Sequence, residues 1–202
     1  MNHTAVSDAH HSAPTSTGLP HRKLMMWAFL ASDCMFFGAL MSTYVIYHGR
    51  SLQGPYPLDV FDLELTTLST FVLLMSSLTM VLTLVAIQRD QRRLFQFWVS
   101  LTILCGMVFL GFQVYEFSHF AHEGLSLQGS LFGSSFFTLT GMHGIHVSIG
   151  VLWLTSLLVY SFRGGLSAER ALDVEIAGLY WHFVDVVWIA IFTVVYLLEF
   201  IT

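Results

Sequence analysis

Five ionisable side chains lie deep inside stretches that are otherwise apolar: Asp33, His143, His146, His182 and Asp185. Asp33, His143 and Asp185 each lie nine residues into such a stretch, about 14 Å along a helix axis. His146 and His182 each lie three residues from His143 and Asp185, so each pair shares a helix face. A charge at the centre of a bilayer costs at least about 2.5 kcal/mol, so such groups should face the interior and pair. We therefore predict one buried polar layer formed by these five side chains.

Aspartate and histidine at one depth support three kinds of chemistry. They can serve as structural groups that hydrogen-bond between helices. Imidazole can ligate haem or a metal. A haem site normally has axial ligands on facing helices, however, and the sequence shows no other metal-binding motif. A series of carboxylates and imidazoles can also relay protons. The sequence contains no nucleophile–base arrangement and no convincing metal-ligand cluster. We therefore expect no catalytic residue, no cofactor ligand and no metal site in this chain.

Three further polar residues lie toward one end of the apolar stretches. Glu116 follows Gln113 by about one helical turn near the end of the third stretch. Glu64 precedes the second stretch, where an acid suits the positive end of a helix dipole. Gln113, Glu116 and Glu64 are therefore further candidates for functional polar groups.

The composition explains why these groups stand out. Of the 202 residues, 55% are hydrophobic and 10% are charged, against about 25% charged residues in soluble domains. The mean hydropathy is +0.69 and the formal net charge is −5. These values exclude a soluble enzyme, a nucleic-acid binder and a disordered chain. An integral membrane protein with one compact domain remains.

Five apolar runs are long enough to cross a bilayer, which needs about 20 helical residues. Because backbone groups find no water in lipid, each run is predicted to be a helix. The runs cover 24–47, 65–87, 94–117, 134–162 and 176–200. We expect an all-α bundle of five transmembrane helices over 24–202, preceded by a flexible polar tail over 1–23.

The basic residues predict the direction of the bundle. Because successive spans cross the bilayer in opposite directions, the segments before the first span, between the second and third, and between the fourth and fifth share one face. Seven of the eight basic residues lie in these segments: Arg22, Lys23, Arg89, Arg92, Arg93, Arg163 and Arg170. Arg50 alone belongs to the other face. The positive-inside rule then predicts a cytoplasmic N-terminus and an external C-terminus.

Four segments of the chain resemble the subunit III family of haem–copper oxidases. The last helix of that family is similar to 179–188 (LYWHFVDVVW), and its penultimate helix is similar to 133–147 (GSSFFTLTGMHGIHV). Its carboxylate-bearing helix resembles 29–38 (FLASDCMFFG), and a further pattern resembles 113–117 (QVYEF). The resemblance extends from about His21 to the C-terminus. It favours the five-helix bacterial type, although Asp33 stands where the family usually has glutamate.

The resemblance implies a non-catalytic role in a larger complex. The expected function is that of subunit III of a proton-translocating bacterial cytochrome c oxidase. Such a subunit contacts subunit I directly, stabilises it and holds structural phospholipids. Haem and copper lie in partner subunits, which include subunit II, and the complex resides in the bacterial cytoplasmic membrane.

Three other functions remain open at this point. The third subunit of quinol oxidases is also a five-helix protein, and nothing in these residues identifies the electron donor. An accessory protein of nitric oxide reductase would share the bundle and the motifs. A stand-alone proton or ion carrier could use the acids at mid-depth.

Overall fold

The computed structural model describes residues 18, 20–47, 63–122 and 131–197, and all its regular elements are helical. The long helices are α1 (His21–Tyr47), α3 (Leu63–Gln88), α4 (Arg92–His122), α5 (Leu131–Phe162) and α6 (Ala171–Phe192). A 3₁₀ turn, η1 (Ala168–Arg170), precedes α6, and a π-helical turn, η2 (Thr193–Leu197), follows it. Five helical segments are long and apolar enough to span a membrane, as predicted.

Most helices extend beyond the apolar runs from which they were predicted. The first helix begins at His21 rather than at residue 24, because the carbonyl of Pro20 accepts hydrogen bonds from the amides of Lys23 (3.0 Å) and Leu24 (3.2 Å). Arg22 and Lys23, which we assigned to the polar tail, therefore lie in the first turn of α1. Apolar windows count only the hydrocarbon core, whereas a helix continues into the polar interface. The rest of the predicted tail, 1–17 and 19, lies outside the described residues.

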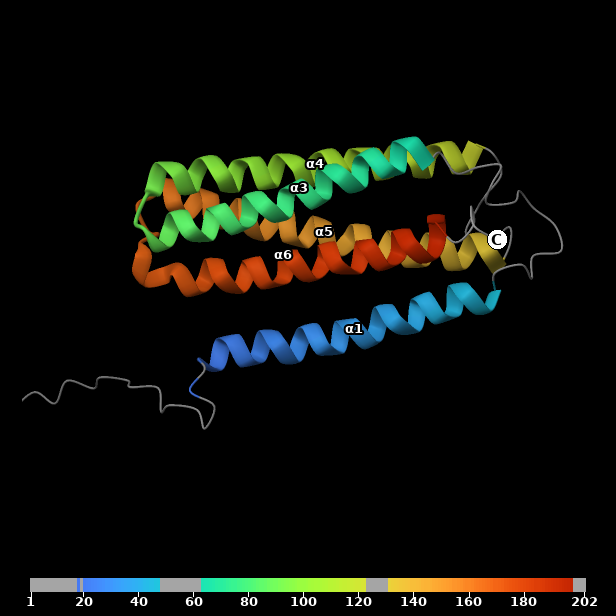
Figure 1. Cartoon of the computed structure of the whole chain (residues 1–202), viewed down its shortest axis with the longest axis horizontal. Helices are drawn as coiled ribbons and strands as arrows, with labels where there is room; N and C mark the ends of the chain where they lie inside the picture. The colour runs from blue at the N-terminus through green and yellow to red at the C-terminus, as the bar shows by residue number, and fades with distance from the viewer. Residues whose placement is uncertain (1–17, 19, 48–62, 123–130, 198–202) are drawn as a thin grey trace, which may run out of the picture.

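Four of the helices, α3 to α6, form a closed ring, and α1 lies outside it. In the ring, α3 packs on α4, α4 on α5, α5 on α6, and α6 on α3. The first helix, α1, packs against α5 and α6 and lies along one side of the ring (Figure 1). Buried apolar side chains fill the ring, among them Trp181 and Trp188 of α6. Much of the outer surface consists of large apolar side chains, as lipid contact requires.

The two described turns between spans are closed by the same backbone motif. After α5, the amide of Gly165 bonds the carbonyl of Tyr160 and the amide of Gly164 bonds that of Ser161. After α3, Asp90 takes the position that Gly164 occupies, with φ values of 54° and 81° respectively. This is the Schellman motif, in which one residue adopts the left-handed backbone conformation with positive φ. Glycine satisfies that need after α5, while aspartate does so after α3.

One end of the bundle collects the described basic residues. The start of α1, the α3–α4 turn and the α5–α6 connection lie at the same end of the molecule (Figure 1). These segments carry Arg22, Lys23, Arg89, Arg92, Arg93, Arg163 and Arg170. Arg50 and most of the two connections at the other end, 48–62 and 123–130, lie outside the described residues. The shared end is therefore a property of the fold, and its cytoplasmic location stays a prediction.

Candidate functional site

Asp33 of α1 and His146 of α5 approach each other near the middle of their spans. Oδ2 of Asp33 lies 3.4 Å from Nε2 of His146, and 14% and 12% of the two side chains are exposed. Nδ1 of His146 lies 2.7 Å from the carbonyl oxygen of Met142, so this nitrogen carries the hydrogen. Nε2 of a neutral ring would then direct a lone pair at a carboxylate oxygen. Attraction between the two groups therefore requires one further proton, held by Asp33 or by His146.

His182 and Asp185 of α6 meet through a serine of α3. The hydroxyl of Ser77 donates to Oδ2 of Asp185 over 2.6 Å, and its oxygen lies 2.8 Å from Nδ1 of His182. Asp185 is buried, whereas His182 and Ser77 are half-buried. The hydroxyl thus connects two groups on one helix to a second helix. Sequence reasoning identified His182 and Asp185 but missed Ser77.

His143 shares no hydrogen bond with either group among the described residues and is packed among aromatic rings. Its ring stacks on Trp188 of α6 with centroids 4.8 Å apart and meets Phe109 of α4 edge-on at 5.8 Å. A third ring, Phe37 of α1, lies 6.5 Å away. The side chain is fully buried, and neither ring nitrogen has a hydrogen-bond partner among the described residues. Aromatic contacts rather than polar ones hold this histidine.

The predicted single layer is therefore divided into three groups. Asp33 and His146 join α1 to α5, the Ser77 group joins α3 to α6, and His143 is packed between aromatic rings of α1, α4 and α6. Asp33 and Asp185 were predicted at similar depth, but among the described residues Asp33 approaches His146 and Asp185 bonds Ser77. Within the described residues, no three His, Cys, Asp or Glu side chains are grouped closely enough to hold a metal ion.

The further polar candidates have different surroundings. Glu116 of α4 is buried, and its Oε1 accepts hydrogen bonds from Thr66 of α3 (2.7 Å) and from the Tyr196 hydroxyl in η2 (3.1 Å). Gln113 is also buried and donates to the carbonyl of Thr140 over 2.7 Å. Glu64, by contrast, is exposed in the first turn of α3. Glu116 and Gln113 therefore connect helices, whereas Glu64 forms no hydrogen bond with another helix within the described residues.

Hydroxyl side chains on α3 accept hydrogen bonds from the two buried tryptophans of α6. Nε1 of Trp188 donates to Oγ1 of Thr70, and Nε1 of Trp181 donates to Oγ of Ser76, both over 2.9 Å. On the adjoining side of α3, Thr79 meets Thr102 of α4 at 2.8 Å. The sequence signal was present, since the buried hydroxyls repeat at helical spacing: Thr66, Ser69, Thr70, Ser76, Thr79 and Thr83.

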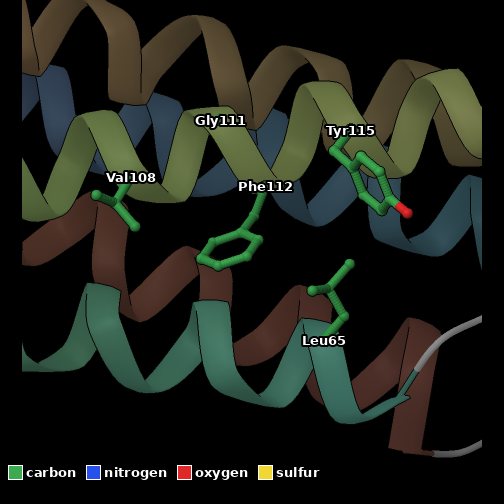
Figure 2. Close-up of a pocket in the computed structure, with 5 residues that line it drawn as sticks. All are labelled: Leu65, Val108, Gly111, Phe112 and Tyr115. Carbon is green, nitrogen blue, oxygen red and sulfur yellow. The ribbon is translucent and has the colours of Figure 1, made fainter.

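Two hollows on the outer surface lie away from these polar groups. Between α3 and α4, a cavity of about 480 Å³ is lined by Leu65, Val108, Gly111, Phe112 and Tyr115. Figure 2 shows the side chains of α4 directed toward α3, with Leu65 opposite them. At the basic end, a second cavity of about 540 Å³ lies between α1, α5 and α6.

Comparison with known proteins identifies the family. The sequence profile described as cytochrome c oxidase subunit III matches residues 2–200, nearly the whole chain. The chain belongs to this family of haem–copper oxidase subunits. A family member named "Probable quinol oxidase subunit 3" from Staphylococcus saprophyticus is 42% identical over 177 residues, covering 87% of this chain and 88% of the relative.

Two other relatives give the same result. Proteins of that name from Staphylococcus epidermidis and Staphylococcus aureus are 40% and 41% identical, covering 93% and 87% of this chain and 96% and 88% of the relatives. This subunit III is thus a multi-pass membrane protein that belongs to an oxidoreductase complex with other oxidase subunits. The relatives' name agrees with the quinol alternative better than with the cytochrome c oxidase that the sequence led us to expect.

Proposed function

We propose that this chain is subunit III of a quinol oxidase, a proton-translocating haem–copper oxidase of a bacterial cytoplasmic membrane. The name of the Staphylococcus relatives, which are 40–42% identical over most of the chain, supports this donor. A cytochrome c oxidase is the second candidate, favoured by the description of the matching family. In both cases haem and copper reside in partner subunits, and the chain contacts subunit I directly.

The proposed role within the complex is to stabilise subunit I rather than to carry out chemistry. The observation that carries this role is the use of buried polar groups between the chain's own helices. Glu116 joins α3, α4 and η2, while Trp181 and Trp188 join α6 to α3. Hydrogen bonds of this kind rigidify a membrane bundle. A rigid bundle offers a partner a surface that is already ordered before assembly.

The cavity at the basic end fits the headgroup region of a phospholipid. Arg22 and Asp173 at its rim pair with each other over 2.7 Å, so Arg170 supplies the net positive charge. An N–H of Arg170 donates to the Tyr160 hydroxyl, which also lines the cavity. Met25 and Leu157 extend the lining with apolar groups. Cations beside apolar surface at one end of a span are the features that bind anionic lipid headgroups. This cavity is therefore the proposed site of a structural phospholipid.

Purification of the complex through a tag on this chain tests the electron donor. In mild detergent, the expected result is a haem-containing oxidase that consumes oxygen with a reduced quinol and not with reduced cytochrome c. Oxidation of cytochrome c alone would select the second candidate. A nitric-oxide-reducing partner, or a chain that purifies alone and conducts protons in liposomes, would contradict the proposal.

The lipid site has a separate test. Mass spectrometry of the purified complex should detect a phospholipid that is reduced severalfold by Arg170→Ala. The control is Arg93→Ala, an exposed residue at the same end of the bundle that does not line the cavity. Equal lipid content in the two variants would exclude this cavity as the site.

A further inference from the structure

Nε2 of His182 is a polar atom at mid-depth that the bundle does not fully enclose. Nδ1 of this ring is occupied by Ser77, while Nε2 has no hydrogen-bond partner in the described part of the chain. Unlike the nitrogens of His143, Nε2 of His182 reaches the surface of the chain. His182 lies near the centre of the Ala168–Leu197 span, where lipid tails offer no hydrogen bond.

Several exposed hydroxyls on the outer surface are paired within their own helix. Ser42 bonds the carbonyl of Gly38 over 2.8 Å, and Thr193 bonds that of Ile189 over 2.8 Å. Such bonds leave no donor unpaired in lipid. Nε2 of His182 cannot turn back to a carbonyl in this way while Nδ1 of the same ring is bonded to Ser77.

The hydrogen bonds behind His182 fix what Nε2 presents. When Asp185 is ionised, the Ser77 proton goes to Asp185, so Nδ1 carries a hydrogen and Nε2 is an acceptor. When Asp185 holds a proton, the series can reverse, with Ser77 donating to Nδ1 and Nε2 carrying the hydrogen. A partner group that can both donate and accept, such as a hydroxyl or a carboxamide, satisfies Nε2 in either arrangement.

Exposed apolar side chains share the helix faces that carry Ser77 and His182. Leu74 and Val81 flank Ser77 on α3, and Val186 and Ile189 follow His182 on the same face of α6, all four exposed. We define the α3–α6 seam as these four residues together with Ser77 and His182. The seam is thus an apolar strip with one polar atom at its middle, which is the pattern of an interface between transmembrane helices.

We propose that the α3–α6 seam docks a transmembrane helix of another oxidase subunit, which presents a hydroxyl or carboxamide side chain to Nε2 of His182. This proposal rests on the proposed function, since it needs a partner subunit. A lipid chain covers the apolar residues but leaves Nε2 unpaired. In a symmetric pair of this chain the two imidazoles would present equivalent atoms to each other, and Ser77 is already engaged. A different polypeptide therefore fits best.

Photo-crosslinking in the intact complex tests the surface. A photoreactive phenylalanine analogue replaces Val186, which is 62% exposed on the seam, or Leu152, which is 69% exposed on α5. We expect position 186 to give an adduct with another subunit severalfold more often than position 152. Lipid adducts only, or an adduct with a second copy of this chain, would overturn the proposal. If either contradicting result is found while the haem-containing partner still copurifies, only the docking proposal fails. If no haem-containing partner copurifies, the proposed function itself fails.

Three substitutions test the hydrogen bond. His182→Phe removes the Ser77 bond and Nε2, whereas Ser77→Ala removes the Ser77 bond and keeps Nε2. His182→Gln keeps a group that donates and accepts. Single hydrogen bonds in membranes predict a roughly three- to fifteenfold weaker subunit association for His182→Phe. Ser77→Ala and His182→Gln should lose less. Equal losses in His182→Phe and Ser77→Ala, measured as subunit dissociation in detergent, would show that the bond from Nε2 to a partner does not exist.

Discussion

Nε2 of His146 lies 3.4 Å from Oδ2 of Asp33, while Nδ1 of the same ring lies 2.7 Å from the carbonyl oxygen of Met142. The carbonyl fixes the hydrogen on Nδ1, so the attraction between His146 and Asp33 depends on one proton that either group can hold. The contact joins α1 to α5 near the middle of both spans. At the basic end, α1 is joined to α6 by the pairs Arg22–Asp173 (2.7 Å) and Lys23–Glu175 (2.5 Å).

Asp33→Asn should leave the initial oxygen consumption of the complex close to that of the unmodified complex. The amide of asparagine can donate to Nε2 of His146, so the contact between α1 and α5 survives without an ionisable proton. An oxygen electrode measures the rate at the start of turnover. Loss of most activity in the first turnovers would contradict a supporting role for Asp33.

Ser77→Ala should lower the free energy of unfolding by about 1 to 3 kcal/mol, because the buried Asp185 loses the hydroxyl that donates to it. The matched control is Ser42→Ala on α1, whose exposed hydroxyl bonds its own backbone at Gly38. The control should change stability by less than about 0.5 kcal/mol. Thermal unfolding in detergent compares the two, and equal effects would show that the α3–α6 bond contributes nothing.

Glu116→Ala should destabilise the chain by about 2 to 3 kcal/mol, since the hydroxyls of Thr66 and Tyr196 lose an acceptor that both use. Glu116→Gln keeps an acceptor oxygen and should lose less. Glu64→Ala, an exposed acid in the first turn of α3, serves as the control and should be nearly neutral. Protease resistance of the membrane-embedded chain is a suitable measurement. A larger loss for Glu64→Ala than for Glu116→Ala would contradict the described network.

Two glycines on α4 should respond in opposite ways to alanine. A Cβ at Gly106 would lie 2.7 Å from Trp181 and 2.9 Å from Val151, so Gly106→Ala should cost about 1 to 3 kcal/mol through overpacking. A Cβ at Gly111 meets no atom within 4 Å, and Gly111→Ala should be neutral or stabilising by up to about 1 kcal/mol. Thermal stability of the two variants in detergent measures the difference. Equal losses would mean that α4 and α6 do not approach as closely as described.

The direction of the bundle is tested by labelling the two termini. A cysteine placed in the N-terminal tail should react with a membrane-impermeant maleimide only in inside-out vesicles, and one placed at the C-terminus only in intact cells. This follows from the basic residues at the end where α1 begins. Labelling of both termini from the same side would refute the five-span topology.

The sequence determined the number of spans, and its basic residues determined which connections share an end. Both follow from local properties, because about 20 apolar residues must form a helix in lipid whatever their neighbours are. The turn after α5 has glycine at its left-handed position, 164. Asp90, which takes the equivalent left-handed position after α3, could not be recognised because aspartate accepts that conformation only occasionally.

The sequence also determined the approximate depth of the ionisable groups, because residue count along a helix fixes the distance along its axis. It did not determine which of these groups meet. That depends on the rotation of each helix about its axis and on the order of helices around the ring, which only packing between distant segments sets. The tertiary structure therefore decided that Asp33 approaches His146, that Ser77 joins His182 to Asp185, and that His143 is held by aromatic rings.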